Sequence, residues 1–387
     1  MFFYRLEYYK GKDILREETN MAKSKKKKRI WLWVVLGIVA VLLLAVIGYV
    51  LYVMISYHRL PDDLALEIRQ PTEGGEAGAE VSAGTDYEIM TYNIGFGAYT
   101  PDYSFFMDGG KSSVAKSRES VLETVSGAGG LTAGYDPDFM IFEEVDLDST
   151  RSYHVDQYEL LDGFFGSYYS DFAINYDSAF LMVPPWEPHG KSLAGIALYS
   201  KYPVTSGVRK SFPISTSFSK FLDLDRCYSI SRIPVENGKE LVIFAQHMSA
   251  YGNSDAIREA QISKLCGDMQ AEYEKGNYVI CGGDFNHDLK ALGDVSEDRE
   301  SWAYPFPREK LPEGFSFSID LLGEEERASM PDSARNADMP YEEGVTYTVT
   351  LDGFIISDNI IMKEYENIHT GYQFSDHDPV RMVFSLK

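Results

Sequence analysis

The stretch from Ile30 to Tyr57 constrains this chain more than any other feature, because it contains no charged residue. A helix rises about 1.5 Å per residue, so a helix of this length can cross a hydrocarbon core of roughly 30 Å. Aromatic side chains typical of the membrane–water interface lie towards its two ends, at Trp31, Trp33, Tyr49, Tyr52 and Tyr57. We therefore predict an uncleaved transmembrane anchor over residues 30–57.

Two other interpretations of this segment stay open. A cleaved signal peptide is the stronger one, although the apolar run is longer than an ordinary signal core and no A-x-A site follows it. A buried core helix rarely needs so long an uninterrupted apolar run.

The residues before the apolar run predict its orientation. Basic side chains stay on the cytoplasmic side of a membrane, so they favour a cytoplasmic N-terminus and an extracellular body. This basic cluster comprises Lys23, Lys25, Lys26, Lys27, Lys28 and Arg29. Met21, just before this cluster, is an alternative start of translation to Met1.

The charge of the chain is unevenly distributed. The first 57 residues hold 10 basic and 4 acidic residues, so the remainder holds 26 basic and 55 acidic ones. Such an acidic body disfavours indiscriminate binding of long nucleic acids, which depends on basic residues that neutralise phosphates. An aromatic content of 14% and a hydrophobic content of 44% exclude wholesale disorder, and three cysteines are too few for a disulfide scaffold.

The composition divides the chain into four expected segments. The stretch from Gln70 to Thr85 is rich in Gly, Ala and Glu and has no aromatic residue, which is typical of a flexible linker. We expect a cytoplasmic basic tail at 1–29, the transmembrane helix at 30–57, an extracellular linker at 58–85 and a catalytic domain at 86–387.

The expected domain shows the patterns of an α/β (α+β) fold. Strands are predicted at 88–96, 138–145, 195–204, 227–235, 240–248, 278–286, 347–357 and 379–386, and helices at 113–125 and 254–275. Asn237-Gly238 predicts a hairpin turn between two of these strands. Hairpins mixed with helical crossovers imply stacked sheets with helices outside.

Polar residues gather where the apolar strands end. They are Asn93, Glu143, Glu144, Asp146, His247, Asp284, Asn286, Asp352, Asp376, His377 and Asp378. Strand ends can hold functional groups in fixed geometry, and carboxylate and amide oxygens suit a hard divalent cation such as Mg²⁺.

Taken singly, each of these residues has a plainer explanation. Asp284 and Asn286 could form a turn, Glu144 could be a solvated charge, and His247 could be a hydrogen-bonded core histidine. Asp352 is harder to dismiss, because it interrupts an apolar strand and an unpaired buried carboxylate is costly. A histidine is its natural partner.

Taken in order, the motifs MTYNIGFG, FEEVD, QHMS, GGDFN, LDGFIIS and FSDHDPV resemble those of the endonuclease/exonuclease/phosphatase superfamily, over roughly residues 86–387. The resemblance implies a DNase I-like four-layer sandwich of two packed mixed β-sheets flanked by helices, here preceded by one transmembrane helix. It also implies a metal site in which Asn93, Glu144 and Asp376 hold Mg²⁺ or Mn²⁺, with Glu144 as the direct ligand. The family's usual Gln-Glu pair appears here as two glutamates.

The same resemblance assigns the catalytic residues. Asp284 would orient or deprotonate the attacking water, and Asn286 beside it would bind the phosphate. His247 and His377 would contact the non-bridging phosphate oxygens, and Asp352 would support one of these histidines and fix its tautomer.

The expected function is a membrane-anchored, outward-facing, metal-dependent hydrolysis of a phosphodiester or phosphomonoester by water attack. The substrate could be nucleic acid, a lipid headgroup or a small phosphoester, and residues 30–57 would bind the lipid bilayer. No obligate protein partner is evident. The alternative is a non-catalytic binding domain on the same scaffold. Asn175, His154 and His189 could border the substrate, although ordinary loop roles fit both histidines.

Overall fold

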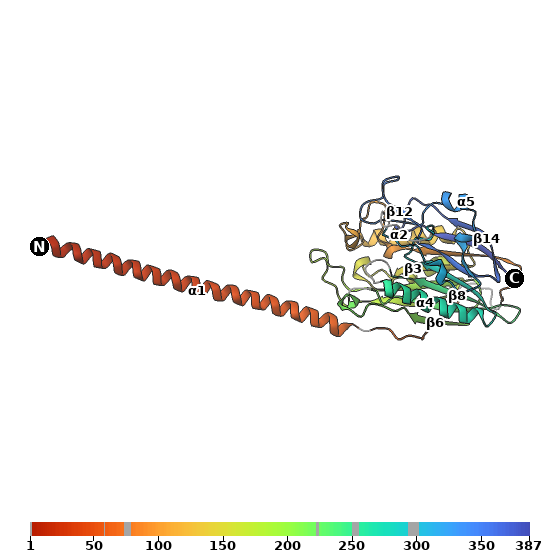
Figure 1. The fold of residues 1–387 in the computed structure, drawn as a ribbon, viewed down its shortest axis with the longest axis horizontal. Helices are drawn as coiled ribbons and strands as arrows, with labels where there is room; N and C mark the ends of the chain where they lie inside the picture. Colours follow the sequence, from red (N-terminus) through yellow and green to blue (C-terminus); the bar gives the residue numbers. More distant parts are fainter. Residues whose placement is uncertain (1, 58, 73–78, 222–223, 250–254, 293–301) are drawn as a thin grey trace. The chain divides into compact units, whose positions relative to one another are not determined.

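The computed structural model describes residues 2–57, 59–72, 79–221, 224–249, 255–292 and 302–387, and the chain forms two compact units, Met1–Ser56 and Tyr57–Lys387. The first unit is one helix, α1 (Phe2–Ser56) (Figure 1). Its part Leu15–Ser56 is long and apolar enough to cross a membrane, although a signal sequence would pass the same test. The basic tail expected before the apolar run therefore continues the same helix.

The second unit is built on two large sheets and a small one (Figure 1). The seven-stranded sheet has the order β1 (Leu64–Leu66), β6 (Ser206–Ser211), β7 (Cys227–Pro234), β8 (Glu240–His247), β9 (Tyr278–Asp284), β13 (Asp352–Ser357) and β10 (Phe315–Phe317). The six-stranded sheet has the order β14 (Ile360–Asn367), β15 (Val380–Leu386), β2 (Asp86–Asn93), β3 (Phe139–Asp146), β5 (Leu193–Ser200) and β4 (Tyr169–Asp177). The third sheet pairs β11 (Ala334–Arg335) with β12 (Thr348–Val349).

The alternation of side chains along each strand produces the layers. Ile89 of β2 and Ile141 of β3 lie in the core shared with β8 and β9, which fills the space between the two large sheets. Met90 and Phe142, one residue further along, point the other way and pack with α2 (Arg118–Ala133) and α3 (Gln157–Phe165). Helix α4 (Asp255–Tyr273) lies on the far side of the sandwich from α2 (Figure 1), and α5 (Glu324–Ser329) is short. The predicted α/β sandwich with flanking helices is confirmed.

Some predicted elements differ in their bounds or were missed. The helix expected at 113–125 begins only at Arg118, because the Ser117 side chain accepts the backbone N–H of Ser120 and caps it there. β4, β6 and β14 were not predicted, because their alternating polar residues weaken the apolar pattern. The hairpin between β7 and β8 is confirmed, with Gly238 at a φ of +78°.

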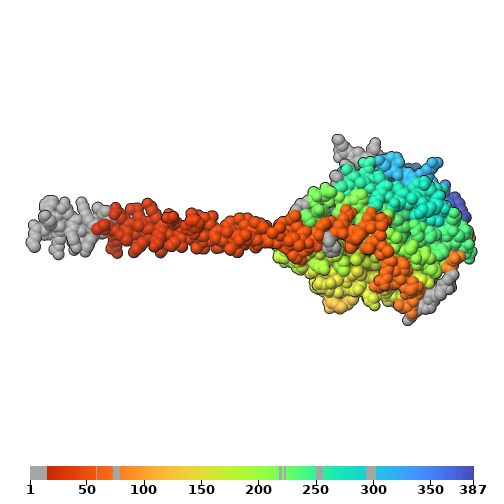
Figure 2. Space-filling model, turned by 90° about the horizontal axis from the view of Figure 1, so that it is seen from below, coloured from red at the N-terminus to blue at the C-terminus, as the bar shows by residue number. Residues whose placement is uncertain are grey.

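The segment expected as a linker, residues 58–85, largely packs against the domain. β1 pairs with β6, Arg59 forms an ion pair with Asp225, and Val81 is fully buried. Figure 2 shows the orange segment lying along the domain surface. Apolar side chains such as Leu66 pack against the core here. The sequence did not predict this packing, because residues 70–85 are rich in Gly, Ala and Glu. Residues 73–78 of the expected linker lie outside the described residues.

Candidate active site

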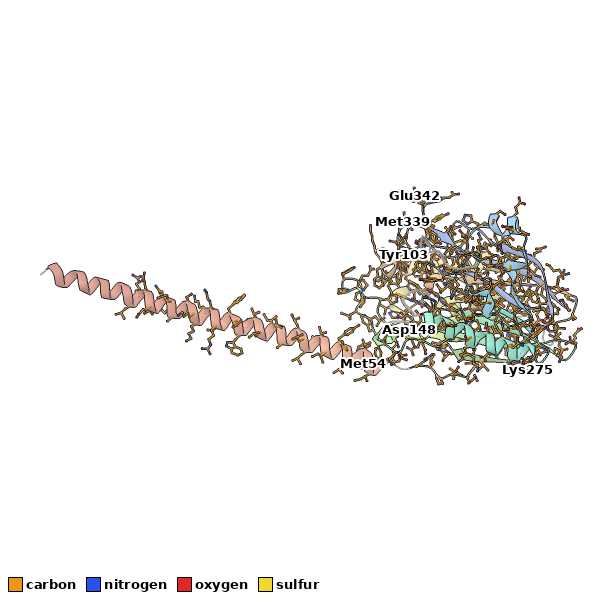
Figure 3. The ribbon with its side chains drawn as sticks, viewed as in Figure 1. Met54, Tyr103, Asp148, Lys275, Met339 and Glu342 are labelled. Atoms are coloured by element: carbon orange, nitrogen blue, oxygen red, sulfur yellow. The ribbon has the colours of Figure 1, made fainter. Side chains whose placement is uncertain are left out.

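The candidate site lies at one end of the space between the two large sheets, which we call the site edge. Asn93 of β2, His247 of β8 and Asp284 of β9 are each the last residue of their strand. His247 is opposite Asp284 in the parallel β8–β9 pair, and Asp284 is opposite Asp352 in the antiparallel β9–β13 pair. Strand register therefore brings residues from three distant parts of the sequence together. Asp148, just beyond the end of β3, lies towards this end of the domain, and Lys275 lies towards the other (Figure 3).

Asp284 is the centre of the cluster. Its Oδ2 atom accepts a hydrogen bond from Asn93 Nδ2 at 3.1 Å, and its Oδ1 atom accepts the backbone N–H of Asn286 at 2.8 Å. Burial raises the pKa of Asp284 to about 7, His377 opposes this rise, and Asp352 adds to it. Gly283 before it has a φ of +135°, and a Cβ atom there would lie 1.9 Å from the carbonyl oxygen of Gln246. The second glycine of the GGDFN motif thus has a steric cause.

Asp352 and His377 form a buried pair. His377 Nδ1 lies 2.8 Å from Asp352 Oδ2, which also accepts the hydroxyl of Ser333 at 2.7 Å. Burial disfavours the imidazolium form of His377, but the carboxylates of Asp352, Asp284 and Asp376 together outweigh burial and raise the His377 pKa well above its usual range. The Nε2 atom of His377 lies 3.8 Å from Asp284 Oδ2. The histidine partner that the sequence predicted for Asp352 is therefore His377, and the pairing favours its cationic form.

The pKa of His247 is shifted in the direction opposite to that of His377. Its Nε2 atom lies 3.4 Å from Asp284 Oδ2, and its Nδ1 atom has no hydrogen-bond partner among the described residues. Burial lowers the His247 pKa well below its usual range, and the positive charges of Arg226 and His377 lower it further. The site therefore favours the neutral form of His247 and the cationic form of His377.

Glu144 reaches the site through an irregularity in β3. The register with β5 shifts between Phe142 and Val145, and Glu144 has a φ of +56°. Asn93 Nδ2 lies 3.5 Å from Glu144 Oε1. Burial raises the Glu144 pKa, Arg151 opposes this rise, and the negative charge of Asp376 adds to it.

All eight residues predicted from the sequence thus lie in or beside one cluster. Asp376 joins it through Ser375, whose hydroxyl lies 3.2 Å from Asp376 Oδ1 and donates to the backbone carbonyl of Asn93 at 2.7 Å. Asn286 also donates from its side chain to the carbonyl of Met248 at 2.9 Å. His154 is paired with Asp148 at the surface, and His189 is buried with its Nδ1 atom 2.8 Å from the carbonyl of Ser113.

Three residues of the site were not singled out as ligands or catalysts. Arg226 is buried, and its Nε and Nη1 atoms have no hydrogen-bond partner among the described residues. It directly precedes β7, so a polar residue at a strand start was the signal available. Asp108 comes from a loop that gave no signal, and burial together with Asp376 and Glu144 raises its pKa to about 7. Glu143 is fully buried; its Oε1 atom accepts the hydroxyl of Thr91 at 2.6 Å, and its Oε2 atom lacks a described partner.

A family model of the endonuclease/exonuclease/phosphatase family matches residues 90–315, which is more than half of the chain. The chain belongs to this family. No protein of curated function matches it. The match begins within β2 and ends within β10, so it includes Asn93, Glu144, His247 and Asp284.

Solved structures confirm the DNase I-like fold. The endonuclease/exonuclease/phosphatase of Beutenbergia cavernae DSM 12333 shares 16% identity over 78% of this chain and 72% of its own, with a TM-score of 0.56. ANGEL2, a 2',3'-cyclic phosphatase, shares 13% identity over 78% of this chain and 96% of its own, with a TM-score of 0.51. TDP2 of D. rerio, solved with a single-strand DNA product, shares 14% identity over 78% of this chain and 99% of its own, with a TM-score of 0.50. At these identities the likeness establishes the fold.

Proposed function

We propose that this family member is a membrane-anchored, outward-facing, metal-dependent hydrolase that cleaves a phosphodiester or phosphomonoester by attack of water on phosphorus. The observation that carries the proposal is the buried series Asp284, His377 and Asp352, in which His377 lies 3.8 Å from Asp284 and 2.8 Å from Asp352, and burial raises the pKa of Asp284 to about 7. A general base is most effective when its pKa is near the working pH, and a nearby cation stabilises charge on phosphoryl oxygens.

The residues of the site fit a hard divalent cation. Carboxylate and amide oxygens make up the donor set of Asn93, Glu144 and Asp376, and burial together with the charge of Asp376 raises the pKa of Glu144, a repulsion that a cation would relieve. Bound Mg²⁺ or Mn²⁺ would polarise the phosphoryl oxygens of the substrate.

A different group, Asp284, Asp352 and His377, has one potential ligand atom from each residue within 4.8 Å of the others. We favour the first set, because Asp352 Oδ2 is already engaged by His377 Nδ1 at 2.8 Å and by the Ser333 hydroxyl at 2.7 Å.

The other side chains of the site bind the phosphate and take up the proton of the attacking water. Asp284 accepts the proton of the attacking water, and Asn286 holds Asp284 in place through its backbone N–H. His377, held by Asp352, donates to a non-bridging phosphoryl oxygen, and neutral His247 contacts the phosphate from the β8 side. The unpaired donors of Arg226 supply a further positive charge.

The membrane assignment rests on α1 and on the basic residues that precede its apolar part. Because cations remain on the cytoplasmic side, the domain of residues 57–387 would be outside. Protease added to intact cells should remove this domain and leave the N-terminal tail. Full protection of the domain would overturn the orientation, and a mature chain that begins after residue 57 would indicate a signal sequence.

The catalytic proposal is tested with the purified full-length chain in detergent. A panel of phosphoesters comprising DNA, RNA, sphingomyelin, inositol phosphates and bis(4-nitrophenyl) phosphate is incubated with Mg²⁺ or Mn²⁺, and then with excess EDTA. We expect EDTA-sensitive turnover of at least one member. Binding of a phosphoester with no turnover of any member would favour the alternative, a non-catalytic binding domain.

A further inference from the structure

We propose that the site edge of the domain lies against the lipid surface in which α1 is embedded, and that the substrate is a phosphoester carried by a lipid of that surface. This proposal rests on the phosphoesterase function proposed above and names its substrate class. Three independent features carry it: where the chain enters the domain, how short the connection to α1 is, and which side chains are exposed beside the site.

The chain enters the domain at the site edge. In the antiparallel pair of β1 and β6, Leu64 is opposite Arg209, so the chain before Leu64 approaches from the Ser211 end of β6, where Asp62 accepts the backbone N–H of Ser211 at 2.9 Å. That end, Ser211, is opposite Cys227, the first residue of β7. Through β7 and β8 the register leads on to His247 and Asp284, so the point of entry and the catalytic cluster belong to the same end of one sheet.

Several contacts hold the entering segment in place. The Nε atom of Arg59 lies 3.0 Å from Asp225 Oδ1, and the backbone N–H of Leu60 donates to Asp225 Oδ2 at 3.0 Å. Asp225 directly precedes Arg226, whose charge acts on His247 and Asp284. The buried guanidinium of Arg209 donates to the carbonyl of Pro61 at 3.3 Å. The residues that receive the anchor therefore adjoin those that form the site.

The connection to the helix is short. α1 ends at Ser56, and Arg59 is already fixed to the domain. A peptide chain extends by at most about 3.6 Å per residue, so these three steps span at most roughly 11 Å. If α1 crosses a bilayer, the site edge is held close to the headgroups and cannot move far from them.

An apolar loop is exposed beside the site. This loop connects β4 to β5, from Asp177 to Leu193, which are opposite each other in the sheet. They lie at the same end of the six-stranded sheet as Asn93 and Glu144. Trp186 is 78% exposed, Met182 46% and Val183 45%. Tryptophan prefers the membrane–water interface, and a group of exposed apolar side chains marks a surface that another apolar surface covers.

The loop is also attached to the site. His189 is buried against the ring of Phe96, with centroids 6.3 Å apart, and Phe96 follows Asn93 by three residues. The side chain of Glu187 accepts the backbone N–H of Ser113 at 2.8 Å. The acidic body disfavours a long nucleic acid, whereas a single phosphate presented by a lipid needs only a local positive charge such as that of the buried Arg226.

The contact with lipid is tested by fluorescence quenching. The full chain and its Trp186→Phe variant are reconstituted in phosphatidylcholine vesicles with and without brominated acyl chains, and the difference between the two proteins isolates the emission of Trp186. We expect this emission to be lost in the brominated vesicles. Equal emission in both kinds of vesicle would overturn the contact.

The substrate class is tested by activity in the same vesicles. We expect Trp186→Ser combined with Val183→Ser to slow hydrolysis of vesicle phospholipid by about tenfold or more, the loss expected when exposed apolar anchors are removed. Hydrolysis of soluble bis(4-nitrophenyl) phosphate should stay unchanged, which shows that the variant is folded. Ile361→Ser is the matched control, because Ile361 is 41% exposed and lies opposite Ser385, at the far end of the six-stranded sheet from Asn93. It should alter neither rate.

The outcomes separate the two proposals. If the soluble diester is turned over but phospholipid is not, the lipid substrate is overturned and the phosphoesterase function stands. The same holds if the loop and control variants slow phospholipid hydrolysis equally. Preferred hydrolysis of a single-stranded DNA oligonucleotide, unaffected by the loop variant, overturns the lipid substrate as well. Failure to turn over any phosphoester overturns the proposed function and the lipid substrate together, and Trp186 quenching then decides the membrane contact alone.

Discussion

Replacing Asp352 by Asn tests the buried pair at the centre of the site. The variant keeps the size of the side chain, and an amide oxygen in the place of Oδ2 can still accept from Ser333 and from His377. What it removes is the charge that holds His377 protonated. Two unit charges 2.8 Å apart attract by roughly 6 kcal/mol at an effective dielectric constant of about 20, and the desolvation of both groups offsets part of this.

We therefore expect turnover of bis(4-nitrophenyl) phosphate to fall by about 10²-fold, or about 2.7 kcal/mol, with little change in the affinity for Mg²⁺. The pH profile supplies a second readout. The Asp352 carboxylate raises the pKa of His377 and so favours its cationic form at neutral pH. Without this carboxylate the His377 pKa should fall, and the alkaline limb of activity should move to lower pH. Ser333→Ala is the matched control, since it removes a hydrogen bond from Asp352 without removing charge, and it should have a much smaller effect.

His377→Ala should be as damaging as Asp352→Asn, and the double variant should be little worse than either, because the two residues act as a unit. Rates would be measured for all four combinations at saturating Mg²⁺. If the two losses simply add, the pairing does not act in turnover, even if each residue proves essential.

Three further predictions follow from single features. Glu144→Ala should weaken Mg²⁺ binding, with turnover partly restored by excess Mg²⁺ in a metal titration; loss of turnover without any change in the Mg²⁺ dependence would contradict the ligand role. Burial raises the pKa of Asp171 from 3.8 to about 7, so the folded state retains a proton that the unfolded chain releases, and this costs up to about 4 kcal/mol of unfolding free energy as pH rises from about 4 to 7. Asp171→Asn should flatten this decline in urea unfolding at several pH values, and an unchanged slope would contradict a buried neutral carboxyl. The fragment 86–387 should fold, but unfold at lower urea than 57–387 because it lacks β1 and the Arg59 ion pair; equal midpoints would show that this segment adds no stability.

The fold and much of the site could be predicted because they depend on local pattern. The uncharged run that forms the end of α1, the Asn-Gly turn at Gly238, and the polar residues that close apolar strands are all visible in the sequence. Strand order was not visible, but the motifs supplied it through the family resemblance. The position of Asp284 opposite both His247 and Asp352 is then a consequence of register.

What could not be predicted depends on contacts between distant segments. Glu144 reaches Asn93 only because of the irregularity in β3, which has no clear sequence signal. The segment that includes β1 was predicted as part of a linker because residues 70–85 after it have a linker composition, yet its apolar side chains pack on the core. The opposite directions in which the pKa values of His247 and His377 shift follow from burial and from the carboxylates beside His377, which only the three-dimensional arrangement supplies.

The most direct test of the central claim is to follow the oxygen atom of the attacking water. The full-length chain hydrolyses a phosphodiester in water enriched in oxygen-18, with Mg²⁺ present, and the product is examined by phosphorus NMR. We expect one labelled oxygen on the phosphorus of each product molecule, no reaction with excess EDTA, and no reaction by Asp284→Ala, which removes the proposed base. Label in the leaving alcohol, or turnover that survives both EDTA and the loss of Asp284, would contradict metal-dependent attack of water on phosphorus at this site.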